Sequence, residues 1–180
     1  MKALKTQIPD LIILEPNLFK DSRGFFFEAW NENTFENFGI KTHFKQDNQS
    51  RSAIGVVRGL HYQLGAPQGK YVRVLKGEIF DVAIDLRRSS PTFGDAFGIN
   101  LSSQNMLALW IPPGFAHGFM SLSDDTDVLY KCTEFYLPNS ERTIIWSDPD
   151  LNIKWPNVAS IKVSSKDARG VRFKEAEYFP

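Results

Sequence analysis

Short apolar segments recur along most of this chain, and turn signals separate them. The segments with strand character are Tyr71–Lys76, Glu78–Leu86, Phe97–Leu101, Met106–Ile111, Ala116–Leu122 and Asp127–Tyr136. Between them stand Gly77, Ser89-Ser90-Pro91, Ser102-Ser103, Pro112-Pro113-Gly114 and Ser123–Asp125. An aromatic content of 13%, with 15 Phe, also favours strands. Strands at intervals of about 8–12 residues with such turns predict an antiparallel sandwich or barrel.

The segment Glu78–Leu86 shows the clearest alternation, with Phe80, Val82, Ile84 and Leu86 on one face and Asp81 and Asp85 on the other. Helical signal is confined to the ends of the chain. It covers Glu32–Phe38 and a short turn that begins near Ser164 or Ser165, with Asp167 in its first turn. Without an internal repeat or a linker, we expect one domain over residues 1–180.

Composition excludes several classes of partner. Lys plus Arg and Asp plus Glu both number 21, so no global basic field attracts nucleic acid or an anionic membrane. The early apolar run Leu11–Leu14 is too short for a signal-peptide core or a membrane span. A single cysteine, Cys132, excludes an internal disulfide framework and is typical of a reducing compartment. We therefore expect a soluble, cytoplasmic protein.

A local concentration of charge lies between Val57 and Val74, which carries Arg58, His61 and Lys70 around a Gly/Pro turn. A hairpin could bring these three side chains to one cavity, where they would offer an anion site and a titratable imidazole. A surface hairpin with solvated basic residues is the alternative, and the segment alone does not distinguish the two.

The run Pro112-Pro113-Gly114-Phe115-Ala116-His117 fits the P-x-G-x-x-H pattern of the second cupin motif, in which the histidine faces the barrel interior. A metal-binding cupin would supply further histidines near His61. Here Gln63 follows His61 at the next position but one, and His43 lies far upstream. A three-histidine site cannot be built from His61 and His117 without His43, so we expect no metal.

Further segments that match the motifs of one known family extend over nearly the whole chain. They are Asp21–Glu28, Gln46–Ser50, Arg58–Gln63, Gln68-Gly69-Lys70, Pro113–Phe119, Tyr130-Lys131, Glu141, Trp146–Asp150, Trp155-Pro156 and Ser165-Lys166-Asp167. Together they resemble the dTDP-4-dehydrorhamnose 3,5-epimerase family, where dTDP is thymidine diphosphate. The resemblance implies an all-β, cupin-like double-stranded β-helix (jelly-roll barrel) with short terminal helices and no cofactor.

The resemblance also implies the reaction, in which the carbons C3 and C5 beside the C4 ketone of a dTDP-4-keto-6-deoxy sugar are inverted. Such chemistry needs a base, a cation or donor at O4, and an acid on the opposite face of the ring. His61 matches the family's base and Asp167 the carboxylate that orients it. Lys70 matches the cation at O4, and Tyr130 the acid.

Each of these residues also has an ordinary structural interpretation. His61 alone could be a hydrogen-bonded structural residue, and Asp167 a first-turn carboxylate. Tyr130, with Val128 and Cys132 on its face, could be a core tyrosine. His117 could likewise be structural, but the resemblance assigns it to substrate binding.

Cations are required for the diphosphate, and Arg23 and Arg58 fit that role. Further positions match the family's ligand contacts: Gln46, Asp47, Asn48, Glu28, Glu141 and Lys166. Phe26 and Tyr136 are candidates for stacking on thymine, whereas we expect Phe25 and Phe27 in a strand that is part core and part interface. The resemblance implies a homodimer whose N-terminal segment crosses to the partner, so that Arg23 and Glu28 complete the neighbour's site.

Three positions depart from many relatives, namely Gln49, Thr143 and Lys166, where histidine, glycine and arginine are frequent. None is one of the four chemical positions. A mono-epimerase or a 3,4-ketoisomerase acting on a dTDP-4-keto sugar is an alternative with similar motifs. A non-catalytic cupin that only binds a nucleotide sugar is another, which the complete set of acid, base and enolate residues disfavours.

Overall fold

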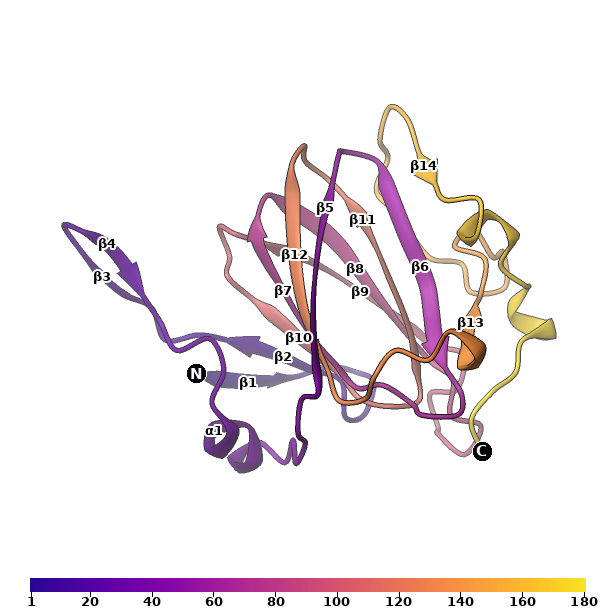
Figure 1. Ribbon diagram of the computed structural model, residues 1–180, viewed down its shortest axis with the longest axis horizontal. Coiled ribbons are helices and arrows are strands. Elements are labelled where there is room, and N and C mark those ends of the chain that lie inside the picture. Colours follow the sequence, from indigo (N-terminus) through magenta and orange to yellow (C-terminus); the bar gives the residue numbers. More distant parts are fainter.

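The computed structural model describes residues 1–180 as two packed β-sheets with an N-terminal hairpin that projects from the body (Figure 1). The first sheet has the strand order β1-β2-β10-β7-β12-β5, and the second has β13-β6-β11-β8-β9 with β14 beside β6. The first sheet contains β1 (Lys2–Lys5), β2 (Ile12–Glu15), β5 (Gln46–Ser52), β7 (Lys70–Lys76), β10 (Ala108–Ile111) and β12 (Thr126–Cys132). The second contains β6 (Val56–Gln63), β8 (Glu78–Asp85), β9 (Ala96–Ser102), β11 (Phe115–Ser121), β13 (Glu141–Thr143) and β14 (Lys162–Val163).

Little of the chain is helical. One α-helix, α1 (Glu32–Asn37), begins at the N-cap Asn31, whose side chain accepts a hydrogen bond from the Thr34 N–H. Three 3-10 turns are η1 (Pro138–Ser140), η2 (Asp167–Arg169) and η3 (Phe173–Glu175). None of the helical segments has the length and hydrophobicity that a membrane-spanning helix requires. The predicted all-β, cupin-like fold with short terminal helices is confirmed.

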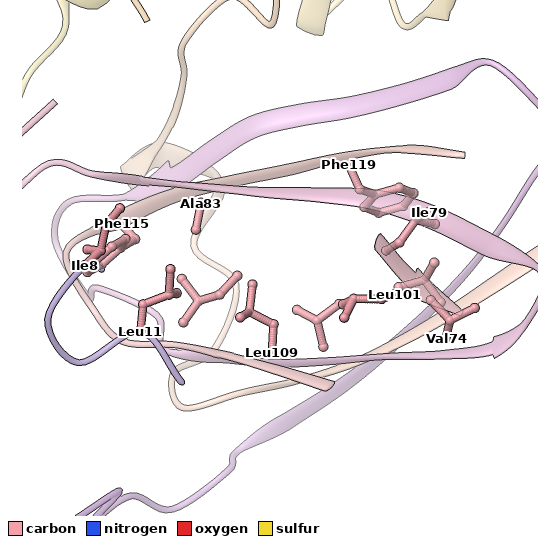
Figure 2. Packing of buried hydrophobic residues seen from close by; sticks show 12 residues of the cluster. Ile8, Leu11, Val74, Ile79, Ala83, Leu101, Leu109, Phe115 and Phe119 are labelled. Carbon is pink, nitrogen blue, oxygen red and sulfur yellow. The ribbon is translucent and has the colours of Figure 1, made fainter. Parts of the chain in front are cut away.

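The main hydrophobic core lies between the two sheets. Figure 2 shows Leu11, Leu109 and Val74 facing Ala83, Ile79 and Phe119 across this space. A second cluster lies outside the second sheet, where the C-terminal segment covers Val82, Ile84 and Leu86. The alternation expected in Glu78–Leu86 is confirmed, but both faces are buried, and Asp81 and Asp85 point into the protein interior.

Two strands of the sequence prediction have misplaced ends. The strand expected over Asp127–Tyr136 ends at Cys132, because the neighbouring strand β7 begins at Lys70, directly opposite Cys132. Strand β10 begins at Ala108 instead of Met106, because Met106 has a left-handed φ of 54° at the end of a turn.

The projecting hairpin consists of β3 (Phe19–Asp21) and β4 (Gly24–Phe26) (Figure 1). Phe25 and Phe26 are exposed on it, with Phe26 at 71%. Phe27 is half-buried, and the Arg73 guanidinium lies over its ring at 5.1 Å. The expected strand contains Phe25, whereas Phe27 follows its end. Neither ring belongs to a core cluster of the single chain, so the core part of the expectation is wrong and the interface part stays a prediction.

Candidate active site

A bulge in β6 turns Arg58 and His61 toward the same cavity. In a regular strand, residues three positions apart face opposite sides. Here Phe119 of β11 pairs with Arg58 and His117 pairs with His61, so three steps along β6 match two along β11. The extra residue reverses the alternation. Gly59, at φ 113°, and Gly118 permit the close approach of the two strands, since a Cβ on either would lie 2.6 Å from backbone atoms.

Asp167 fixes the imidazole of His61. His61 Nε2 lies 2.7 Å from Asp167 Oδ1, and the other carboxylate oxygen accepts the Gly59 N–H at 3.2 Å. The Asp167 N–H donates to Ser164 Oγ at 3.0 Å, which anchors η2 beside β6. Burial opposes ionisation of Asp167, but the hydrogen bonds and the charge of His61 outweigh it and lower the carboxyl pKa. The carboxylate is therefore ionised at neutral pH beside an imidazole that can take up a proton.

His117 and Lys70 lie in the same cavity and are almost fully buried. His117 Nε2 lies 2.8 Å from Asp81 Oδ2, and the Asp81 side chain has no solvent exposure. Lys70 Nζ donates to the His61 carbonyl oxygen at 3.5 Å. Burial lowers the pKa of both Lys70 and His117, although the negative charge of Asp81 opposes the shift in each case.

Tyr130 enters the cavity from β12 of the first sheet, opposite His61 and His117 of the second sheet. Its neighbours across the first sheet are Asn48 of β5 and Val72 of β7, and all three share the inward face. Burial raises the pKa of the Tyr130 hydroxyl, with Arg58 opposing the shift. The cavity has a volume of about 490 Å³. Its lining brings together seven of the predicted residues: Arg58, His61, Lys70, His117, Tyr130, Lys166 and Asp167.

A second cavity of about 270 Å³ adjoins the first and shares His61, Lys70 and Tyr130 with it. It contains four further predicted residues: Gln46, Asn48, Tyr136 and Glu141. The Tyr136 hydroxyl donates to Glu141 Oε2 at 2.7 Å, and Lys166 Nζ donates to the same oxygen. Eleven of the predicted residues thus line one continuous hollow between the sheets.

Three predicted residues lie away from this hollow. Arg23 is at the hairpin turn, paired with Asp21 at 2.6 Å. Glu28 accepts hydrogen bonds from Asn31 and Thr34 at the start of α1. Asp47 faces outward from β5 and pairs with Lys131 at 2.9 Å. Their roles in ligand binding stay predictions.

Asp81 and Ser164 are site residues that the sequence analysis did not identify. Asp81 is a carboxylate in the middle of a strand rich in apolar residues, and that position was the available signal, because a buried charge needs a partner. Ser164 accepts the Asp167 N–H within one turn of the backbone, and nothing in the sequence around it indicates this contact. No group of three or more His, Cys, Asp or Glu side chains is arranged to hold a metal ion.

The arrangement places an imidazole–carboxylate pair and a tyrosine hydroxyl around one cavity, groups that can accept and donate a proton. The model of the family described as dTDP-4-dehydrorhamnose 3,5-epimerase matches residues 5–175. The chain belongs to this family.

Members of the epimerase family resemble it over most of their length. The dTDP-4-dehydrorhamnose 3,5-epimerase of Pseudomonas aeruginosa is 53% identical over 100% of both chains. The dTDP-6-deoxy-D-glucose-3,5-epimerase of Legionella pneumophila, solved with dTDP-4-keto-L-rhamnose, is 48% identical with a TM-score of 0.95, covering 98% of this chain and 94% of that one. A 3'-monoepimerase from Streptomyces bikiniensis, solved with dTDP-quinovose, is 31% identical with a TM-score of 0.87, covering 93% and 85%.

Proposed function

We propose that this epimerase-family chain inverts C3 and C5 of dTDP-4-dehydro-6-deoxy-D-glucose to give dTDP-4-dehydro-L-rhamnose. One observation carries the assignment: the His61–Asp167 pair and Tyr130 enter the same cavity from opposite sheets. A sugar ring between them would have a base on one face and an acid on the other. Inversion requires this arrangement, because a proton returned to the face it left restores the original configuration.

His61 is the base in this proposal. The protons on C3 and C5 are acidic because the carbanion left behind delocalises onto the C4 oxygen. The ionised Asp167, 2.7 Å from the ring, stabilises the imidazolium that forms when His61 takes a proton. Its second oxygen holds the Gly59 N–H, so the carboxylate cannot rotate away from His61.

Lys70 and His117 bind the enolate oxygen. Both are buried in the cavity, where an electrostatic interaction with developing charge is stronger than in water. The lowered pKa of Lys70 also makes its ammonium a better proton donor to that oxygen. Tyr130, whose raised pKa keeps the hydroxyl protonated at neutral pH, returns a proton from the far face.

The nucleotide lies in the second cavity, with Tyr136 stacked on thymine and Gln46, Asn48, Glu141 and Lys166 as polar contacts. Arg58 and Arg23 bind the diphosphate. Since Arg23 lies on the projecting hairpin of its own chain, we assign it to the site of a second copy in a homodimer. The exposed phenyl rings of the hairpin support this assignment, because contiguous exposed apolar surface is typical of an interface.

Solvent deuterium incorporation tests the proposal. In deuterium oxide, the wild-type protein should convert dTDP-4-dehydro-6-deoxy-D-glucose to a product that carries deuterium at C3 and C5, as NMR would show. In His61→Asn, turnover should fall by about 10²–10⁴-fold and deuterium exchange should be lost at both carbons, because the base is absent. His43→Asn is the matched control, since His43 is exposed, pairs only with Glu32 and lines neither cavity.

The pattern of exchange also separates the alternatives. Deuterium at C3 alone would indicate a mono-epimerase, and a product with its ketone moved to C3 would indicate a ketoisomerase. Binding of the substrate without any exchange would indicate a non-catalytic nucleotide-sugar binder. Exchange retained by His61→Asn at either carbon would contradict the role of His61 as sole base.

A further inference from the structure

The segment Phe135–Leu137, which carries Tyr136 into the second cavity, lies outside every helix and strand. No backbone group of Phe135 or Tyr136 bonds to another backbone group. Side-chain amides take that role. The Tyr136 N–H donates to Gln46 Oε1 at 2.9 Å, and the Gln68 amide donates to the preceding Glu134 carbonyl at 2.8 Å. Glutamine side chains therefore determine the path of this segment.

Gln63 makes the largest number of these contacts. Its Nε2 donates to the carbonyls of Ala66, at 2.6 Å, and Phe135, at 3.1 Å, and its Oε1 accepts the Leu137 N–H at 2.8 Å. Gln63 borders the second cavity but is only 3% exposed, so water cannot replace these bonds readily. Two of them hold the residues immediately before and after Tyr136.

We propose that Gln63 is a positioning residue that fixes Tyr136 for the nucleotide and thereby sets nucleotide affinity, without taking part in proton transfer. The inference rests on the proposed function, because it takes thymine as the partner of the Tyr136 ring. Tyr136 itself is 46% exposed and is held at its hydroxyl only by Glu141. Its ring would lose its preferred orientation if the backbone on both sides were released.

Only an amide of this length satisfies all three backbone groups. It supplies two N–H donors and one carbonyl acceptor, and all three are used. A carboxylate at this position would keep the acceptor and lose both donors. A thioether of the same length would keep the packing and lose all three bonds. The two replacements therefore separate the hydrogen bonds from the volume of the side chain.

Titration calorimetry with thymidine diphosphate tests the proposal on the full-length protein. Gln63→Met and Gln63→Glu should each raise the Kd about five- to tenfold, because the binding surface must then be ordered when the ligand binds. The KM for the nucleotide sugar should rise in parallel, while kcat changes by less than about threefold, since no group at the reacting carbons is altered. Thermal unfolding confirms that each variant is folded.

Ser102→Ala is the control for a general loss of stability. Ser102 is also buried, its hydroxyl accepts two backbone N–H groups of a turn, and it lines neither cavity. It should lower the unfolding temperature and leave the Kd unchanged. A weaker Kd in Ser102→Ala would contradict the proposal, because instability alone would then account for the effect.

A double-mutant cycle with Tyr136→Ala distinguishes positioning from other effects. If Gln63 acts through the ring, Gln63→Met should change the Kd by less than about twofold once the ring is gone. An undiminished effect in the Tyr136→Ala background, or an unchanged Kd in both single Gln63 variants, would overturn the inference. Failure of the wild-type protein to bind thymidine diphosphate would instead contradict the proposed function.

Discussion

At the scale of single residues, the neighbours of each titratable group in the cavity determine its charge. Asp167 stays ionised because its hydrogen bonds, above all the one with His61, and the charge of that imidazole outweigh its burial. Lys70 and His117 receive less compensation, and burial lowers their pKa values. Tyr130 is kept protonated by burial. The cavity thus combines an ionised carboxylate beside His61 with two buried donors, Lys70 and His117, whose pKa values are lowered, and with a Tyr130 hydroxyl that keeps its proton. This set of groups suits the proposed reaction through an enolate.

Tyr130→Phe tests whether Tyr130 is the catalytic acid or only a core tyrosine. The ring and nearly all buried area remain, so the free energy of unfolding should fall by roughly 1 kcal/mol or less. Turnover should fall by about 10²–10⁴-fold, as expected for loss of a general acid. His61 would still remove protons, so NMR should detect deuterium exchange without completed inversion, most clearly at C5.

The control for this variant is Tyr178→Phe, which removes a hydroxyl that donates to the Phe173 carbonyl away from both cavities. It should lower the free energy of unfolding and leave the product unchanged. A Tyr130→Phe protein that makes the doubly inverted sugar at nearly the wild-type rate would show that Tyr130 is only a packing residue.

The sequence predicted part of the candidate active site. The short segment that carries Arg58, His61 and Lys70 indicated that a hairpin could bring them to one cavity, but it did not exclude a surface hairpin with solvated basic residues. The pairing of His61 with Asp167, 106 residues apart, followed only from the family resemblance, because contact across that separation depends on the fold. Asp81 was missed as the partner of His117. The alternation of β8 showed which face of the strand carries Asp81, but it did not show that this face lies inside the barrel.

At the scale of secondary-structure elements, the bulge between β6 and β11 is the feature that assembles the site. It was not predicted, because a bulge shifts the register by one residue and leaves no separate apolar pattern. Strand ends were also misplaced, as in β12, whose length is set by the start of its neighbour β7 and not by its own residues. Central strands such as β8 were located well, because their alternation is long and regular.

Gly59→Ala should disrupt the bulge. The new Cβ would lie 2.6 Å from the Gly118 Cα and from the His117 carbonyl oxygen, at a φ of 113° that favours glycine. We expect a loss of roughly 1–3 kcal/mol in the free energy of unfolding, measured by denaturant titration. Activity should fall more than stability predicts, because the displaced strands carry His61 and His117.

Gly39→Ala provides the comparison, since Gly39 also has a left-handed φ, of 83°, but no atom lies within 4 Å of its added Cβ. It should cost stability through backbone strain alone and leave kcat unchanged in the folded protein. Equal activity of the two variants would show that the bulge does not determine the catalytic geometry.

At the scale of the whole molecule, the space between the two sheets holds both the main hydrophobic core, seen in Figure 2, and the cavity lined by the proposed catalytic residues. The hairpin β3–β4 belongs to neither region, because it projects from the body (Figure 1). A two-stranded hairpin is marginally stable by itself in water, and this one exposes Phe19, Phe25 and Phe26. A second copy of the chain would supply the missing contacts and receive Arg23.

Subunit complementation tests this exchange. Arg23→Ala and His61→Asn should each have low activity alone. In a mixed dimer, the arm of the His61→Asn chain would bring Arg23 to the barrel that retains His61, and so restore one site. Random assembly from equal amounts, with two affinity tags on co-expressed chains, should therefore recover about a quarter of the wild-type rate, because half of the dimers are mixed and each has one intact site. If Arg23 served its own barrel, no mixed dimer would contain an intact site, and the mixture would stay as inactive as its components.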